Sequence, residues 1–282
     1  MASMPASRMV VTVPSPTLQR ARGTGRVTVG ARDGHSYLGR LYQEGCAKIR
    51  LPHTFDASVQ AVLINTAGGL TGGDVMEWSA EATADTRLVL TTPACERIYK
   101  STGDDARVTT RLIVAAGARL DWLPQETILF EDSRLDRRMH VDLADDATFC
   151  AIEAVLLGRD AMGESARRAR LKDNWRIMRN GRLIHAEATA ITADPERERE
   201  GLALLRSAKA FATVFYAGAD ANARFDRIRA LTPDTPALGM SLTGDKLVVR
   251  AMAHSGLALR RLIIPIIAAL SGAGAVPRLW TL

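Results

Sequence analysis

Short apolar runs separated by turn residues make up most of the chain from residue 58 onward. Residues 138–143 alternate strictly between polar and apolar side chains, which is typical of a strand with one buried face. Residues 148–157 are almost wholly apolar apart from Glu153, so they predict a strand buried on both faces. Similar runs predict strands at residues 59–66, 75–82, 87–92, 107–115, 171–178, 182–190 and 247–252.

Turn residues recur about every ten to fifteen positions between these runs. They include Gly72-Gly73, Gly103-Asp104, Asp145-Asp146 and Asn180-Gly181, the last of which is a strong hairpin signal. Regular helices do not separate the predicted strands, which argues against a Rossmann or TIM-barrel arrangement. The rhythm instead favours a sandwich, a barrel or a stack of sheets.

Helical periodicity is confined to the last third of the chain. Residues 196–216 carry a stripe of Leu and Ala and predict a helix, and residues 222–231 predict a second. Residues 257–270 predict an apolar helix that is kinked or restarted at Pro265 and belongs to the core rather than to a docking face. We therefore expect a β-rich α+β fold, with about eleven strands in a large stacked or helical, mostly antiparallel arrangement and two or three C-terminal helices.

The net charge of +6 arises mainly at the N-terminus. Five arginines and no acidic residue precede Asp33, so the remainder of the chain is close to neutral. This distribution argues against a nucleic-acid-binding face. Pro, Ser and Thr are frequent in residues 1–30, which predicts a poorly ordered basic tail followed by a single domain over residues 31–282.

The apolar runs and the cysteines bear on location. No apolar stretch reaches the ~18 to 20 residues that a membrane-spanning helix needs. The N-terminus lacks the apolar core of a secretory signal. The three cysteines are far apart in sequence and form neither a disulfide framework nor a zinc motif. We expect a cytoplasmic protein with no membrane contact.

The glycine-rich segment 63–74 ends in Asp74 and has two interpretations. Gly68, Gly69, Gly72 and Gly73 follow a predicted strand, as in loops whose backbone N–H groups hold a phosphate. No Gly-Lys-Ser/Thr follows, however, so the segment is not a P-loop. A pair of tight turns that need positive φ is the favoured interpretation, and the alternative is a loop that places Asp74 at a site or interface.

Several side chains are candidates for catalysis. Glu126 and Glu131 resemble an acid/base pair, but their five-residue separation puts them on opposite sides of a strand. Glu153 is unusual in an apolar strand, and Arg159 is a plausible partner for it. Cys95 has no histidine near it in sequence, so it is a weak candidate nucleophile. A hydrolase that uses Glu126, Glu131 or Glu153 therefore stays open as an alternative.

Four segments in this order resemble the urease accessory protein D family, called H in some organisms. They are LINTAGGLTGGD at 63–74, TTPACERIYKS at 91–101, LPQETILF at 123–130 and EAVLLGRDAMGE at 153–164. DNWR at 173–176, together with Gly181, extends the likeness.

The resemblance implies a urease maturation chaperone or scaffold and no enzymatic activity. Members of the family dock on apo-urease and recruit the accessory F protein, which recruits the nickel-carrying GTPase G. The complex couples GTP hydrolysis to nickel insertion into the urease metallocentre. The family fold is a stack of strands with a few helices at its side. The helices after Pro195 are then candidates for the contact with F.

The resemblance also suggests an internal passage for nickel and no tightly bound cofactor. Isolated carboxylates hold Ni²⁺ weakly and can release it, whereas His/Cys clusters would retain it. By motif position, the candidate passage residues are Asp74, Glu153 and Glu164, followed by Glu126 and Glu131. The remaining motif residues are expected to be structural: Gly68, Gly69, Gly72, Gly73, Arg97, Arg159 and Gly163.

Overall fold

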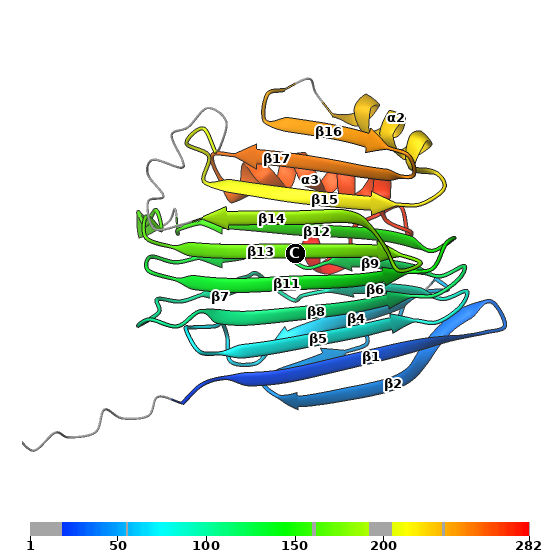
Figure 1. Ribbon diagram of the computed structural model, residues 1–282, viewed down its shortest axis with the longest axis horizontal. Coiled ribbons are helices and arrows are strands. Elements are labelled where there is room, and N and C mark those ends of the chain that lie inside the picture. The colour runs from blue at the N-terminus through cyan, green and yellow to red at the C-terminus, as the bar shows by residue number, and fades with distance from the viewer. Residues whose placement is uncertain (1–18, 55, 160–161, 192–204, 233–234, 282) are drawn as a thin grey trace, which may run out of the picture.

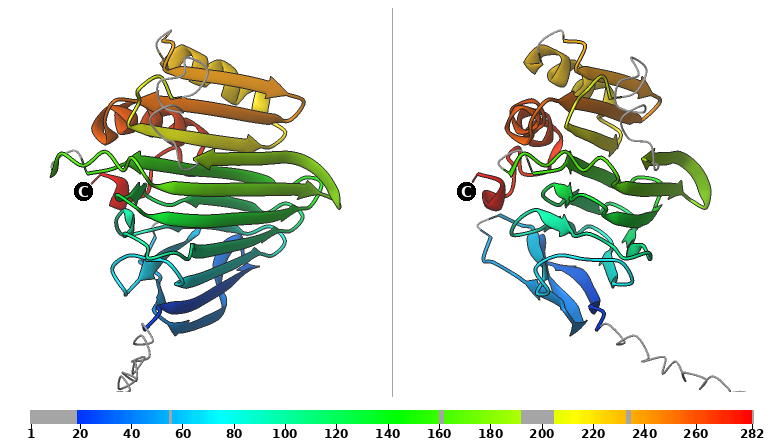
Figure 2. Two further views of the ribbon diagram at one scale, coloured as in Figure 1. Left: turned by 60° about the vertical axis from the view of Figure 1, so that its left-hand side comes forward. Right: turned by 90° about the vertical axis from the view of Figure 1, so that its left-hand side faces the viewer.

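The computed structural model describes residues 19–54, 56–159, 162–191, 205–232 and 235–281, and its strands form two sheets that face each other (Figures 1 and 2). The first sheet has the order β14 (Arg182–Ile191), β13 (Arg170–Arg179), β11 (Arg134–Leu143), β8 (Ala106–Val114), β5 (Val75–Ala82), β1 (Arg22–Arg32) and β2 (His35–Gly45). The second has the order β16 (Leu238–Thr243), β17 (Lys246–Ala253), β15 (Ala210–Ala217), β12 (Thr148–Leu157), β9 (Arg119–Leu123), β6 (Arg87–Thr91), β4 (Val59–Asn65) and β3 (Ala47–Arg50), with β7 (Glu96–Ile98) and β10 (Thr127–Leu129) beside this path. The helices are α2 (Ala221–Leu231), α3 (Gly256–Leu270) and the short 3₁₀ helix η2 (Arg278–Trp280).

From β5 to β13 the chain crosses repeatedly from one sheet to the other, as in a solenoid. Successive strands of the first sheet, β5, β8, β11 and β13, are therefore parallel, and so are β6, β9 and β12 of the second. Antiparallel pairs such as β1–β2 and β13–β14 also occur, so the sheets are mixed and the expectation of mostly antiparallel strands is wrong. Most of these turns lead to a strand of the opposite sheet and not to the neighbouring strand of the same sheet. When the chain returns to the first sheet, the new strand therefore runs parallel to the previous one.

Two apolar cores hold the layers together. The first fills the space between the sheets, where alternate residues of strands such as β11 point inward. The second lies between the second sheet and α3, which packs on the outer face of that sheet (Figure 2). β12 lies between the two cores, which explains why nearly all of its side chains are buried.

Most predicted elements are confirmed with small shifts at their ends. The predicted strands correspond to β4, β5, β6, β8, β11, β12, β13, β14 and β17, and the two later helices correspond to α2 and α3. α3 is one helix with Pro265 inside it, and six of its residues are buried, in accord with a core role. The seventeen strands of the described residues exceed the expected eleven, because short strands such as β7 and β10 carry no periodic signal.

Two sequence-based expectations need correction. The helix predicted at residues 196–216 is wrong where the structure describes it, because Ala210–Ala217 forms the buried strand β15; residues 196–204 lie outside the described residues. Part of the expected tail is also ordered, since Arg22–Arg32 forms β1, whereas residues 1–18 are not described. Among the described residues, no helix is long and apolar enough to cross a membrane.

Candidate functional site

A buried cluster of charges lies between the two sheets. Arg137 points inward from β11 and forms an ion pair with Glu153 of β12 in the opposite sheet. Its other terminal nitrogen lies 2.6 Å from Asp173, the residue beside it in β13. The remaining carboxylate oxygens accept hydrogen bonds from indoles, Glu153 from Trp122 at 2.9 Å and Asp173 from Trp175 at 3.1 Å. Both carboxylates are thus held in place by two donors each.

The cluster carries two acids and one base, and burial sets its protonation. Burial raises the pKa of the Glu153 carboxyl to about 7; Arg137 opposes this shift and Asp173 adds to it. For Arg137, burial opposes the charged form, but the charges of Asp173 and Glu153 outweigh it and raise the pKa. Arg137 therefore stays charged and supplies the positive charge that faces both carboxylates.

A cavity of about 60 Å³ with a mixed polar and apolar wall adjoins this cluster. A buried water occupies roughly 10–15 Å³ on this measure, so the cavity has room for a few waters. The polar side chains on its wall are Glu96, Glu153, Arg137, Gln125, Thr127, Thr92 and Thr110, and the apolar wall includes Trp78 and Trp122. Nε of Arg137 is buried and has no protein partner, which is consistent with a water in this space.

Glu96 of β7 is the second carboxylate of the cavity, and the sequence analysis missed it. Its oxygens accept hydrogen bonds of 3.2 and 3.3 Å from Asn65 at the end of β4. Burial raises the pKa of Glu96 to about 7, although Asn65 and the backbone N–H of Arg97 oppose this shift. Because Asn65 also donates to the carbonyl of Gly69, it ties the cavity to the glycine-rich segment.

The glycine-rich segment is a pair of tight turns and not a phosphate cradle. Its backbone N–H groups at Gly68, Leu70, Thr71, Gly73 and Asp74 all donate to protein oxygens. Gly69 has a φ of 149°, and a Cβ there would lie 2.3 Å from the Tyr99 ring, so only glycine fits. Asp74 is buried, and its oxygens accept hydrogen bonds from Ala21 N at 2.8 Å and Thr71 N at 2.7 Å. Asp74 thus closes the turn and does not line the cavity.

Comparison with known proteins agrees with the motifs. A sequence model described as UreD urease accessory protein matches residues 21–281. "Urease accessory protein UreD" of Chelativorans sp. (strain BNC1) is 58% identical over 269 residues, which cover 95% of this chain and 96% of that protein. The protein of the same name from Rhizobium etli is 52% identical over 264 residues, with 94% and 96% covered. The chain belongs to the UreD family.

Glu126 lies outside the cavity of this UreD family member and anchors its C-terminus. The carboxylate is buried and pairs with Arg260 of α3 through two hydrogen bonds of 2.6 and 2.9 Å. Arg260 also donates to Gln125 and to the carbonyl of Trp280. Burial raises the pKa of the neighbouring Cys95 thiol to about 11, and Glu126 adds to this shift. Cys95 is therefore a poor nucleophile.

Glu131 and Glu164 hold the loop that follows β12. Glu164 pairs with Arg159 and accepts a hydrogen bond of 2.7 Å from the backbone of Glu131. The Glu131 carboxylate accepts hydrogen bonds from the backbone of Arg167 and Arg168. The proposed pairing of Arg159 with Glu153 is wrong, because Arg159 pairs with Glu164 and Arg137 takes its place at Glu153. Gly163, with a φ of 65°, lies in the same loop, and Arg97 is exposed.

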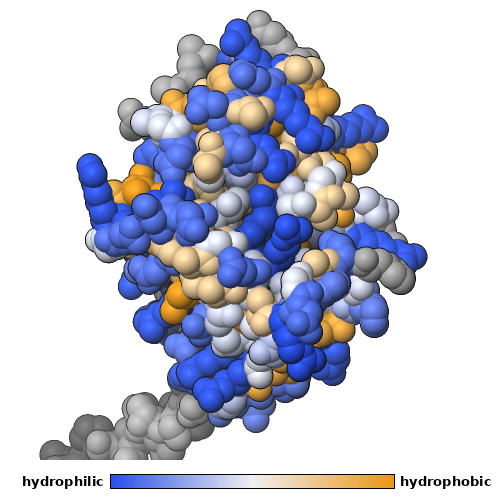
Figure 3. All heavy atoms as spheres, turned by 90° about the vertical axis from the view of Figure 1, so that its right-hand side faces the viewer, coloured by the Kyte–Doolittle hydropathy of each residue, from blue (hydrophilic) through white to orange (hydrophobic). Residues whose placement is uncertain are grey.

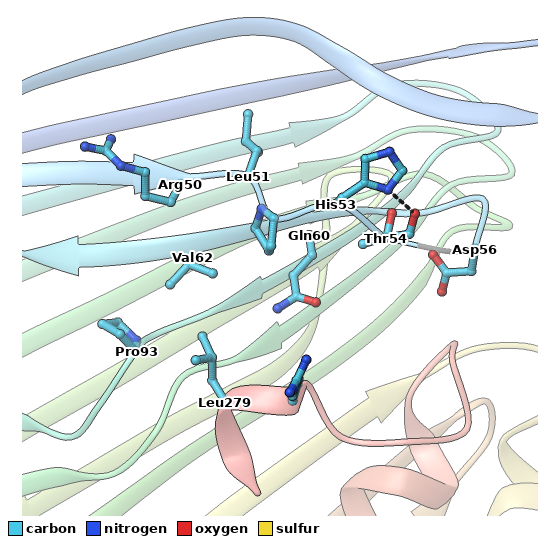
Figure 4. Close-up of a pocket in the computed structure, with 11 residues that line it drawn as sticks. Arg50, Leu51, His53, Thr54, Asp56, Gln60, Val62, Pro93 and Leu279 are labelled. Carbon is cyan, nitrogen blue, oxygen red and sulfur yellow. Dashed lines mark hydrogen bonds between the residues drawn. The ribbon is translucent and has the colours of Figure 1, made fainter. Parts of the chain in front are cut away.

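A larger, open pocket lies between the β3–β4 region and η2 (Figure 4). Its volume is about 790 Å³, and its wall contains His53, Gln60 and Arg278. Asp56, which accepts hydrogen bonds from Ser58, is its one carboxylate. In the part of the chain that the structure describes, no group of three His, Cys, Asp or Glu side chains could hold a metal ion. The intersheet cavity, with two carboxylates, is the better candidate for transient metal contact.

Proposed function

We propose that this chain is a urease maturation scaffold that docks on apo-urease, recruits the accessory F protein and the nickel GTPase G, and assists GTP-dependent nickel insertion. Family membership supports the role in urease maturation, and the names of the relatives describe accessory proteins rather than catalysts. In this proposal, the chain works in the cytoplasm and has no tightly bound cofactor. α2, at one end of the molecule, is the proposed contact for F.

The observation that carries the proposed nickel passage is the intersheet cavity with its two carboxylates. Glu96 and Glu153 supply hard oxygen ligands, and Arg137 beside them places a positive charge against a bound cation. Such a site attracts Ni²⁺ less strongly than a His/Cys cluster does, so the ion can leave again. Nickel is here the cargo of the protein.

In this proposal the passage runs past Glu153 and Glu96, because these two carboxylates line the cavity and the other motif carboxylates do not. Asp74 is committed to backbone N–H groups, and Glu126 is committed to Arg260. Glu131 and Glu164 are committed to the loop after β12. The same observations weaken the hydrolase alternative, because Glu126, Glu131 and Glu153 have separate partners and do not form an acid/base pair.

The test is expression of Glu96→Gln with the host's urease subunits, F and G. Glu77→Gln is the control, because Glu77 is exposed on the outer face of β5. We expect both variants to co-purify with F, G and apo-urease, and only Glu96→Gln to yield urease with less nickel per active site at limiting nickel. Equal nickel contents would refute the passage, and wild-type chain that elutes alone while urease is still activated would refute the scaffold.

A further inference from the structure

The edge strand β2 carries an unusual set of exposed large side chains. Tyr37 and Tyr42 are 48% and 43% exposed, and Leu38 and Leu41 are exposed beside them. β2 ends the first sheet, and among the described residues no strand pairs with its outer edge (Figure 1). Long exposed edge strands with apolar side chains invite pairing with another chain. Soluble proteins usually protect such edges, so this edge needs an explanation.

The register with β1 gives the hairpin two different faces. Leu38 and Leu41 oppose Val29 and Val27, whose side chains enter the core. The two leucines therefore continue the inner, apolar face of the sheet to its edge, where both stay partly exposed. The tyrosines lie on the other face, which continues the exposed surface of the sheet.

The two tyrosines are held in place before any partner arrives. The Tyr37 ring lies over Gly30, where a Cβ would come within 2.8 Å of the ring, and over the guanidinium of Arg32 at 5.7 Å. Tyr42 lies under the guanidinium of Arg26 at 5.4 Å and donates a 2.5 Å hydrogen bond to Glu44. Tyr and Arg, with Trp, are enriched in interface hot spots, and ordered side chains lose less entropy on binding.

The outer edge of β2 offers backbone hydrogen bonds beyond Ser36, whose N–H donates to the carbonyl of Ala57. Arg22 directs its carbonyl to Cys46 N, whereas Ala21 directs its carbonyl to Val75 of β5. The backbone groups of even-numbered β1 residues therefore form hydrogen bonds with β2. The β2 residues opposite them include Tyr42 and Arg40. By the same alternation, the N–H and C=O of Leu41 point away from β1. They are available to an added strand.

The charge of the hairpin selects the kind of partner. Residues 22–45 contain four arginines against Asp33 and Glu44. Arg26, Arg32 and Arg40 are all exposed. A second copy of the chain on the same edge would oppose like charges, which is destabilising. Figure 3 shows the end of the molecule where the hairpin turns, and hydrophilic residues predominate there, with only small apolar groups between them.

We propose that the free edge of β2 is a docking site for an extended acidic segment of a partner protein, which adds to the sheet as a further strand. Its carboxylates would face Arg26, Arg32 and Arg40, and its apolar side chains would cover Leu38 and Leu41. The hairpin lies at the opposite end of the molecule from α2 and β16, so both ends can be occupied together (Figure 1). The inference rests on the proposed function only for the choice of apo-urease as a probe.

The first experiment uses an eleven-residue peptide that alternates Glu with Val, and a Lys/Val peptide as the control. We expect the acidic peptide, but not the Lys/Val peptide, to bind the full chain and to slow amide hydrogen exchange at Leu38 and Leu41.

Two variants test the position of the site. Leu41→Pro removes one outward N–H without touching the β1 pairing, and Arg40→Glu reverses a charge, so both variants should weaken binding of the acidic peptide. Arg111→Glu, an exposed position on β8, is the matched control and should not. Equal binding of both peptides, or none of the acidic one, would overturn the inference.

The second experiment measures apo-urease binding to the Tyr37→Ser/Tyr42→Ser variant. Ile113→Ser, an exposed apolar position on β8, is its control. We expect roughly a tenfold or greater loss of affinity for the tyrosine variant only. If the acidic peptide binds while wild-type chain fails to bind apo-urease, the β2 site stands and the proposed docking on urease fails. If apo-urease binds all variants as it binds wild type, docking stands and its assignment to β2 is wrong.

Discussion

Arg137 and Glu153 join the two sheets through an ion pair in which each side chain is less than a tenth exposed. Asp173, beside Arg137 in the parallel register of β11 and β13, shares the same guanidinium. One cation therefore neutralises part of the charge of two buried carboxylates. This arrangement makes Arg137 the most sensitive position of the cluster, because its loss leaves both acids without a counter-charge.

We expect Arg137→Ala to lower the free energy of unfolding by about 3–5 kcal/mol, the usual cost of breaking a buried ion pair. Urea unfolding followed by tryptophan fluorescence measures it, since Trp122 and Trp175 bond to the cluster. The matched control is Arg138→Ala on the next position of β11, where the side chain is 60% exposed and pairs with Asp136. That change should cost less than about 1 kcal/mol. Similar losses in both variants would contradict a special role for the buried cluster.

Removal of the Asp74 carboxylate should loosen the glycine-rich segment. Asp74→Ala leaves the N–H groups of Ala21 and Thr71 without their acceptor, which we expect to cost about 1.5–3 kcal/mol of unfolding free energy. Asp74→Asn keeps one carbonyl acceptor and should fall between wild type and Ala. Thermal unfolding measures the order of the three proteins. Asp104→Ala, at an exposed position nearby, should unfold like wild type, and a loss there equal to that of Asp74→Ala would count against the argument.

The alternation of side chains predicted most of the strands but not the way they pair. Periodicity reports which face of a strand is buried, and both parallel coils and antiparallel hairpins bury one face in the same way. Ala210–Ala217 shows a second limit: it is apolar apart from Thr213, and such a run fits a buried strand as well as a buried helix. Only its position between β12 and β17 decides the matter. Local sequence does not contain that information.

The candidate site was only partly accessible from the sequence. Glu153 was recognised because a charge in an apolar strand is costly. Arg137 has the inward parity of Met139 and Val141, but the predicted strand began at residue 138, so Arg159 was taken as the partner of Glu153 instead. Glu96 gave no such signal, since β7 has only three residues and its burial depends on Asn65 and the surrounding strands. The cavity is lined by residues that are far apart in sequence, and the spacing of residues along the chain does not predict which of them lie close together in space.

Arg260 should be irreplaceable by lysine, because it makes a two-pronged contact with Glu126 and also reaches Gln125 and Trp280. We expect Arg260→Ala to lower the unfolding free energy by about 3 kcal/mol or more, since Glu126 is left buried without its partner. Arg260→Lys should recover less than half of that loss. Proteolysis at residues 271–281 should accelerate in both variants, because Trp280 loses an anchor.

The control for this prediction is Arg261→Ala, the exposed neighbour in α3. Its unfolding free energy should stay within about 0.5 kcal/mol of wild type. Full recovery by lysine would show that charge alone matters at position 260 and that the two-pronged geometry does not.

Glu96 should make the stability of the protein fall as pH rises. Its pKa is raised from 4.5 to about 7 in the folded chain, mainly by burial. Below pH 4.5 both states hold the proton, and between the two values only the folded state does, so the stabilisation is lost as pH rises through that window. Gln cannot ionise. Relative to wild type, Glu96→Gln should therefore gain on the order of 2 kcal/mol of unfolding free energy between pH 5 and pH 8.

Urea unfolding of wild type and Glu96→Gln at several pH values measures this difference, and the subtraction removes the contribution of every other titrating group. Glu77→Gln reports the generic effect of replacing a glutamate on an exposed strand position. A stability difference for Glu96→Gln that does not change with pH would mean that Glu96 is ionised in the folded chain throughout. The cavity would then carry a permanent negative charge, which would strengthen its hold on Ni²⁺ and weaken the argument that the ion is readily released.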